Sequence, residues 1–135
     1  MHAEEARGVT RFDAGVEETP DFRIEAANVN GITVLSLVGA LDMVTAPELS
    51  KAIEAAQYQR PSGLIIDMSQ VDFLSSSGMS ALVAAQQEFG DEVRFCVVAD
   101  GPATSRPMRL IGLDEQLALF ATLDDALADI GAADR

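Results

Sequence analysis

Short blocks of apolar residues, separated by turn-forming residues, run through the chain from residue 21 onward. Residues 22–26 alternate between apolar and polar side chains, which is typical of a half-buried strand. After an Asn-Val-Asn-Gly turn at residues 28–31, the apolar and β-branched residues 32–38 predict a second strand, so the two strands form a hairpin. The wholly apolar run at residues 64–66 predicts a strand that is covered on both faces, and residues 93–98 predict another buried strand.

Apolar residues spaced three and four apart predict the helices between these strands. The sequence Thr-Ala-Pro-Glu at residues 45–48 fits a capping box with proline in the first turn, so the first helix begins there. Residues 79–89 predict a second helix with these side chains facing inward: Met79, Leu82, Val83 and Phe89. A third helix over residues 105–111 ends at Gly112, and Thr122 opens a last helix.

Strands that alternate with helices predict a mixed, mostly parallel sheet. With a short strand at residues 118–120, the order is β-β-α-β-α-β-α-β-α, with an N-terminal β-hairpin and right-handed crossovers. We therefore expect a single α/β domain over residues 21–131. Residues 1–20 are acidic and show no sustained period, so we expect a flexible tail there, and a short C-terminal tail at residues 132–135.

Composition and charge exclude several classes of function. The 135 residues include 22 acidic and 9 basic ones, and the formal net charge of −13 repels phosphate backbones and anionic lipid surfaces. We therefore expect no direct binding of nucleic acid and no membrane association. One cysteine allows no intramolecular disulfide, and residues 1–20 lack the apolar stretch of a signal peptide, so we expect a protein of the cytoplasm.

Candidate catalytic groups are scarce. The single histidine is His2, beside the start methionine, whereas a Ser-His-Asp hydrolase needs a positioned imidazole and a zinc site needs clustered cysteines and histidines. The Gly-rich phosphate-binding motifs and H-E-x-x-H are missing from the sequence. We interpret Cys96 as a small core residue. We therefore expect no enzymatic activity, no metal and no cofactor.

Two loops that leave a strand and enter a helix, residues 38–45 and 72–79, carry the candidate chemistry. With regular crossovers they lie at the same end of the sheet, where function collects in such folds. In the second loop three serines precede Gly78, and the helix needs only one of them as its N-cap. The other interpretation is a phosphoacceptor at the positively polarised start of the helix. Asp42, in the first loop, either bonds its own backbone in an Asx-type turn or is an exposed acceptor for a partner.

Three stretches together resemble the STAS domain, and in particular the small bacterial anti-sigma factor antagonists. They are Gly39-Ala40-Leu41-Asp42, the stretch from Val71 to Met79, and Ile111-Gly112-Leu113. The resemblance implies a STAS-like fold and a partner-switching function. In that family the unphosphorylated protein binds an anti-sigma factor, which is also an ATP-binding serine kinase of the GHKL type, and so frees the sigma factor. Phosphorylation of one serine ends the binding, and a serine phosphatase restores it.

The resemblance also implies which residues act. Counted back from Gly78, the phosphorylated serine is Ser76, and the partner-binding residues are Asp42, Met43, Thr45, Ser75, Ser76, Ser77, Gly78 and Met79. The family usually has Asp before the acceptor, where this chain has Ser75, so Ser75 and Ser77 are alternative acceptors. The alternative functions are a STAS subunit of a larger assembly, such as a stress-signalling complex or a lipid-transport apparatus, and a binder of small nucleotides.

Overall fold

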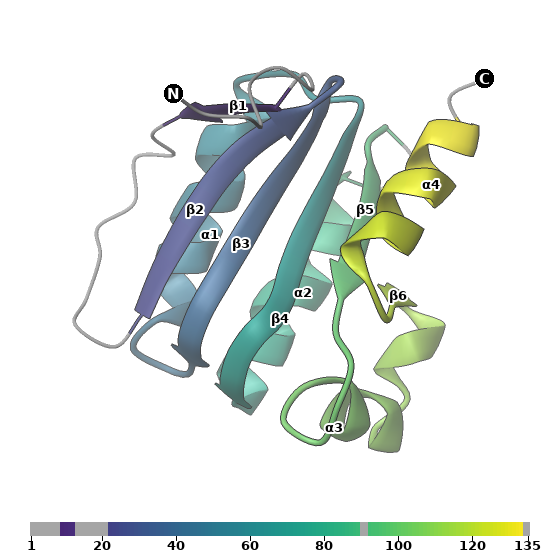
Figure 1. Ribbon diagram of the computed structural model, residues 1–135. Helices are drawn as coiled ribbons and strands as arrows, with labels where there is room; N and C mark the ends of the chain where they lie inside the picture. Colours follow the sequence, from purple (N-terminus) through teal and green to yellow (C-terminus); the bar gives the residue numbers. More distant parts are fainter. Residues whose placement is uncertain (1–8, 13–21, 90–91, 134–135) are drawn as a thin grey trace.

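The computed structural model describes residues 9–12, 22–89 and 92–133. They form a six-stranded sheet in which each strand pairs with its neighbours in the sequence, in the order β1-β2-β3-β4-β5-β6 (Figure 1). The strands are β1 (Val9–Phe12), β2 (Phe22–Val29), β3 (Ile32–Leu41), β4 (Gly63–Leu74), β5 (Arg94–Val98) and β6 (Ala118–Phe120). The helices are α1 (Ala46–Gln57), α2 (Ser76–Phe89), α3 (Ser105–Leu110) and α4 (Leu123–Ala133), with a 3-10 turn η2 (Leu113–Glu115).

The predicted hairpin and the mixed, mostly parallel sheet are confirmed. β2 and β3 run antiparallel, while β3, β4, β5 and β6 are parallel to one another. The hairpin turns at Asn30 and Gly31, with φ of 53° and 90°, which these two residue types tolerate. The side chain of Asn28 accepts a hydrogen bond from the Gly31 N–H at 3.0 Å, which fixes the turn.

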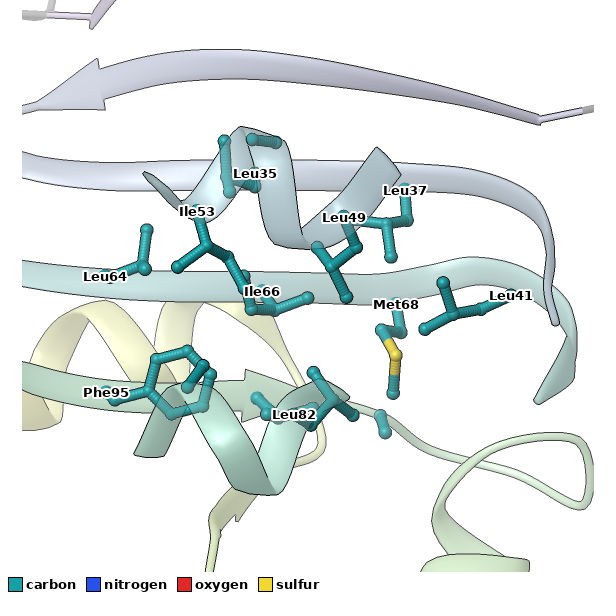
Figure 2. Packing of buried hydrophobic residues seen from close by; sticks show 14 of the residues in the cluster. Leu35, Leu37, Leu41, Leu49, Ile53, Leu64, Ile66, Met68, Leu82 and Phe95 are labelled. Carbon is teal, nitrogen blue, oxygen red and sulfur yellow. The ribbon is translucent and has the colours of Figure 1, made fainter. Parts of the chain in front are cut away.

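The sheet separates two apolar layers of unequal size. In Figure 1, α1 and α2 lie behind the sheet and α4 lies in front of β5 and β6. Leu35 and Leu37 of β3 point into the larger layer beneath α1 and α2, which Figure 2 shows from close by, whereas Val34 points into the smaller layer with α4. Cys96 is buried in the smaller layer, which confirms its interpretation as a core residue.

The structure differs from the sequence prediction at both ends of the chain. Val9–Phe12, within the expected tail, form β1, which pairs antiparallel with residues 26–29 of β2. Four residues are too few to show a period, and the strand is defined by the β2 edge on which it lies. α4 continues to Ala133, beyond the expected end of the domain. The other residues of both expected tails lie outside the described part of the chain.

β3 and β4 are also longer than predicted from the sequence, and α2 begins earlier than predicted. β4 extends to Leu74 and α2 begins at Ser76, so Ser75 alone separates them, and the expected loop at residues 72–79 is mostly strand and helix. Two irregularities in the pairing of β3 with β4, after Ser36 and after Gly39, each place an extra residue in β4. Such bulges break the two-residue period, which is why the sequence indicated a loop.

Candidate partner-binding site

The structure brings the two predicted loops together at the carboxyl ends of β3 and β4. Leu41 and Leu74 are in register as the last residues of these two parallel strands. The N–H of Ser75 then donates a hydrogen bond to the carbonyl oxygen of Leu41 at 2.9 Å, so the start of α2 is tied to the end of β3. The residues that lead into α1 and those that begin α2 therefore share one surface.

Asp42 and Thr45 form a closed network of hydrogen bonds in the first loop. One carboxylate oxygen of Asp42 accepts the N–H groups of Val44 and Thr45 at 2.9 and 3.0 Å. The N–H of Asp42 donates to the hydroxyl of Thr45 at 2.8 Å, and that hydroxyl donates to the carbonyl oxygen of Ala40 at 2.8 Å. The Asx-type turn is therefore confirmed. The predicted capping box is wrong, because the Thr45 hydroxyl is used in this network and makes no cap bond to α1.

The same network acts on the charge of Asp42. The backbone N–H of Thr45 is the main cause that lowers the pKa of the carboxyl below its usual value of 3.8, and the Thr45 hydroxyl and the Val44 N–H add to it against the opposing effect of burial. Asp42 is ionised at neutral pH and fixes the path of the loop.

The loop between Asp42 and Thr45 holds two apolar side chains out in solvent. Met43 is 74% exposed and Val44 is 69% exposed, although each residue type usually favours a core. Phe73, near the end of β4, is 54% exposed, while its neighbour Leu74 is buried. Val44 and Phe73 were not among the predicted site residues, because an apolar residue type alone does not distinguish an exposed side chain near an element's end from a core one.

The three serines have three different environments. The hydroxyl of Ser75 accepts a hydrogen bond from the Gly78 N–H at 3.2 Å, three residues on, and donates to the Leu41 carbonyl oxygen at 3.2 Å. This is the geometry of an N-cap, so Ser75 caps α2. Ser77 is half-buried, and Ser76 is exposed in the first turn of the helix. The hydroxyl of Ser76 is therefore accessible without loss of the cap.

Gly78 lets the first turn of α2 approach β3 and β4 closely. A Cβ atom at this position would lie 2.8 Å from Cγ of Leu41 and 2.9 Å from Cδ1 of Leu74. Distances this short force the two leucine side chains to shift, so packing favours glycine here, and no left-handed φ is involved. Gly78 positions the serines and does not itself offer a side chain to a partner.

A groove of about 380 Å³ begins at Ser76 and lies between α2 and the residues around η2. Its walls come from α2 and from residues 111–116 in and around η2: Ser76, Met79, Ser80, Val83, Ala84, Gln87, Ile111, Leu113 and Gln116. Ile111 is 63% exposed beside it. Met79, predicted to face inward, is only partly buried and packs against the core while also lining the groove. We call Met43, Val44, Phe73, Ser76 and this groove the docking face.

Metal-ligating and nucleophilic side chains are the remaining candidate groups. No group of three or more His, Cys, Asp or Glu side chains gathers among them to hold a metal ion. Burial is the main cause that raises the pKa of the Cys96 thiol, to about 11, and the nearby Asp129 adds to it, so this thiol is a poor nucleophile. Within the same residues, none of the helices has both the length and the apolar character that crossing a membrane requires.

Comparison with known proteins identifies the family. The model of the STAS domain matches residues 23–126. The anti-sigma-F factor antagonist RsfB of Mycobacterium tuberculosis is 43% identical over 114 residues, which cover 83% of this chain and 93% of that protein. The crystal structure of an anti-sigma factor antagonist from Mycobacterium paratuberculosis is 44% identical and superposes with a TM-score of 0.78 over 84% of this chain and 98% of that one.

More distant solved structures share the fold. SpoIIAA in its unphosphorylated form is 19% identical with a TM-score of 0.66, over 82% of this chain and 96% of that one. The phosphorylated form of the Bacillus protein is 21% identical with a TM-score of 0.59, over 81% and 98% of the two chains. With a matching domain model over most of its length and a relative of the same kind above 40% identity, this chain belongs to the STAS-domain family that includes the anti-sigma factor antagonists.

Proposed function

We propose that this protein is an anti-sigma factor antagonist, which binds an anti-sigma factor through the docking face and so releases a sigma factor. The similarity to two mycobacterial antagonists, at 43% and 44% identity over most of both chains, supports this function. Exposed apolar side chains at the end of the sheet where Ser76 lies are what a protein partner would cover. The protein is then a binding partner and a kinase substrate, with no active site of its own.

The observation that carries the proposal is that Ser75 caps α2 while Ser76 beside it is exposed. Ser75 caps α2, so esterification of Ser76 leaves the cap bond intact. A phosphate on Ser76 adds about −1.5 to −2 charges at the start of the helix, where free N–H groups and the helix dipole tolerate an anion. The fold survives while the docking face changes.

Phosphorylation would end binding because we expect a partner seated on Met43 and Val44, next to the start of α2, to cover Ser76 as well. A phosphate dianion in a closed apolar contact loses its water without gaining an opposite charge, and each factor of ten in affinity corresponds to only about 1.4 kcal/mol. The phosphoryl group comes from ATP held by the partner, which we expect to be a serine kinase of the GHKL type, and a serine phosphatase removes it.

Binding of the cognate anti-sigma factor by calorimetric titration tests the switch. We expect Ser76→Ala to bind like the unmodified protein and Ser76→Glu to bind at least tenfold more weakly, because the added carboxylate opposes the apolar contact. The matched control is Ser62→Glu, which adds the same charge at the exposed amino end of β4, far from the docking face.

Incubation with the kinase and ATP, followed by peptide mass spectrometry, tests the acceptor. We expect one phosphate on Ser76, which is retained in Ser75→Ala and lost in Ser76→Ala. A phosphate mapped to Ser75 or Ser77, or equal affinity for Ser76→Glu and Ser62→Glu, contradicts the proposal.

A further inference from the structure

The outer edge of β2 is only half covered by β1. β2 has eight residues, and β1 pairs with the last four, from Ala26 opposite Phe12 to Val29 opposite Val9. The backbone N–H and C=O groups of an open strand edge are a template for another strand, which is why natural proteins protect such edges. In this protein β1 is the protection, and it lies outside residues 23–126 that match the STAS domain.

The charges along β2 show why its two halves need different protection. The first half carries Arg23 and Glu25, both exposed and joined by an ion pair at 3.1 Å. Charged side chains on an edge strand disfavour pairing with another chain. Residues 26–29 are Ala, Ala, Asn and Val, with no charge among them. β1 therefore covers the half of the edge that has no charged side chain to block association.

The segment that joins β1 to β2 is long enough for β1 to pair with β2 of the same chain. Nine residues, 13–21, join β1 to β2 and span up to about 30 Å when extended. Phe12 lies opposite Ala26, four residues along the strand from Phe22, which corresponds to about 13 Å. Nine residues are therefore enough to span this distance, and a short tether keeps a segment near its site at a millimolar effective concentration.

We propose that the edge of β2 at residues 26–29 is a self-association surface, and that β1 is the intramolecular strand that covers it. When β1 leaves, residues 26–29 of a second copy pair antiparallel with the same residues, which gives a two-fold symmetric dimer with a continuous sheet. An isologous contact of this kind is self-complementary, and the uncharged residues place no like charges opposite one another. This inference does not depend on the anti-sigma factor or on Ser76.

The double variant Thr10→Pro/Arg11→Pro in the full chain displaces β1. Alternate residues of an edge strand point their N–H toward the neighbouring strand, so one of two adjacent prolines removes a hydrogen bond to β2 whichever residue donates it. We expect this variant to form dimers whose proportion rises with concentration in sedimentation velocity, while the unmodified protein and the control Ala3→Pro/Ala6→Pro stay monomeric.

Two further measurements assign the dimer to the β2 edge. Ala27→Lys places a positive charge in each copy near the two-fold axis, so adding it to the double variant should restore the monomer, while Ala27→Lys alone should leave the unmodified chain monomeric and folded. In hydrogen exchange, we expect those amides of residues 26–29 that face β1 to exchange faster in the double variant at low concentration and to regain protection as dimers form.

Three results overturn the proposal. A double variant that stays monomeric up to its solubility limit shows that the uncovered edge does not associate. Dimers that persist with Ala27→Lys place the contact elsewhere. Unchanged exchange of residues 26–29 in the double variant shows that β1 is not the cover.

Discussion

Individual polar side chains decide which groups of the docking face reach the surface. Ser75 occupies the cap position, which leaves Ser76 exposed, and Asp42 with Thr45 holds Met43 and Val44 outside the core. The sequence indicated the serines and Asp42 as candidates, and the resemblance implied Ser76 as the phosphoacceptor, but the residues alone did not show which serine caps α2. The choice between Ser75 and Ser76 as the cap depends on where α2 begins, and that position depends on the irregular end of β4.

The charge of Asp42 makes a testable contribution to stability. Its pKa is lower in the folded protein than the usual 3.8, so the stabilisation is fully present above about pH 4 and is lost as the pH falls through the folded-state pKa. We expect Asp42→Asn, which keeps one acceptor oxygen but no charge, to be less stable than the unmodified protein at neutral pH, with the difference vanishing in acid.

Urea unfolding at a series of pH values measures this difference. Asp72→Asn, which removes an exposed charge from neighbouring β4, is the control for net charge and should show a smaller difference. A deficit for Asp42→Asn that persists undiminished below the folded-state pKa would mean that loop geometry, and not charge, is the cause.

At the scale of elements, regular segments could be predicted from the sequence and irregular ones could not. The hairpin, the buried strands, the end of α3 before the left-handed Gly112 and the Thr122 cap of α4 follow from local signals. The end of β4 did not, because its two bulges are imposed by pairing with β3. β1 was missed for the same reason, since it exists only through its partner strand.

Replacement by alanine should have opposite effects on stability at two helical glycines, because one is tightly packed and the other is not. Gly78→Ala places a methyl group within 3 Å of Leu41 and Leu74, and overpacking of this kind costs about 1–3 kcal/mol, more than the ~1 kcal/mol gained in helix propensity. Gly131, in α4, has nothing within 4 Å of its added Cβ atom, so Gly131→Ala should stabilise by up to about 1 kcal/mol.

Thermal and urea unfolding of the two variants tests this pair directly. A Gly78→Ala variant as stable as Gly131→Ala would show that Leu41 and Leu74 yield without cost, and that the close approach does not fix the start of α2.

For the whole molecule, the net charge of −13 sets the response to salt. The ion pairs of the described residues, such as Arg94 with Asp129 and Arg109 with Asp114, lie at the surface, where they contribute little. Repulsion among excess carboxylates destabilises the compact state, and raising the ionic strength from about 10 to 150 mM shortens the Debye length from about 30 to 8 Å.

We therefore expect the free energy of unfolding to increase with NaCl over this range. Denaturation in urea, which is uncharged, measures it, and KCl at equal ionic strength should give the same result. A decrease with salt would mean that attractive ion pairs outweigh the repulsion.

The parallel strands also determine where attachments to this protein can be made. The docking face lies at the carboxyl ends of β3 and β4, whereas β1 and the last turn of α4 lie at the opposite end of the sheet (Figure 1). A fluorescent label or an affinity handle joined ahead of β1, or after α4, starts at the far end of the molecule from Ser76. Immobilisation through either position therefore leaves the serine and its surroundings facing the solution.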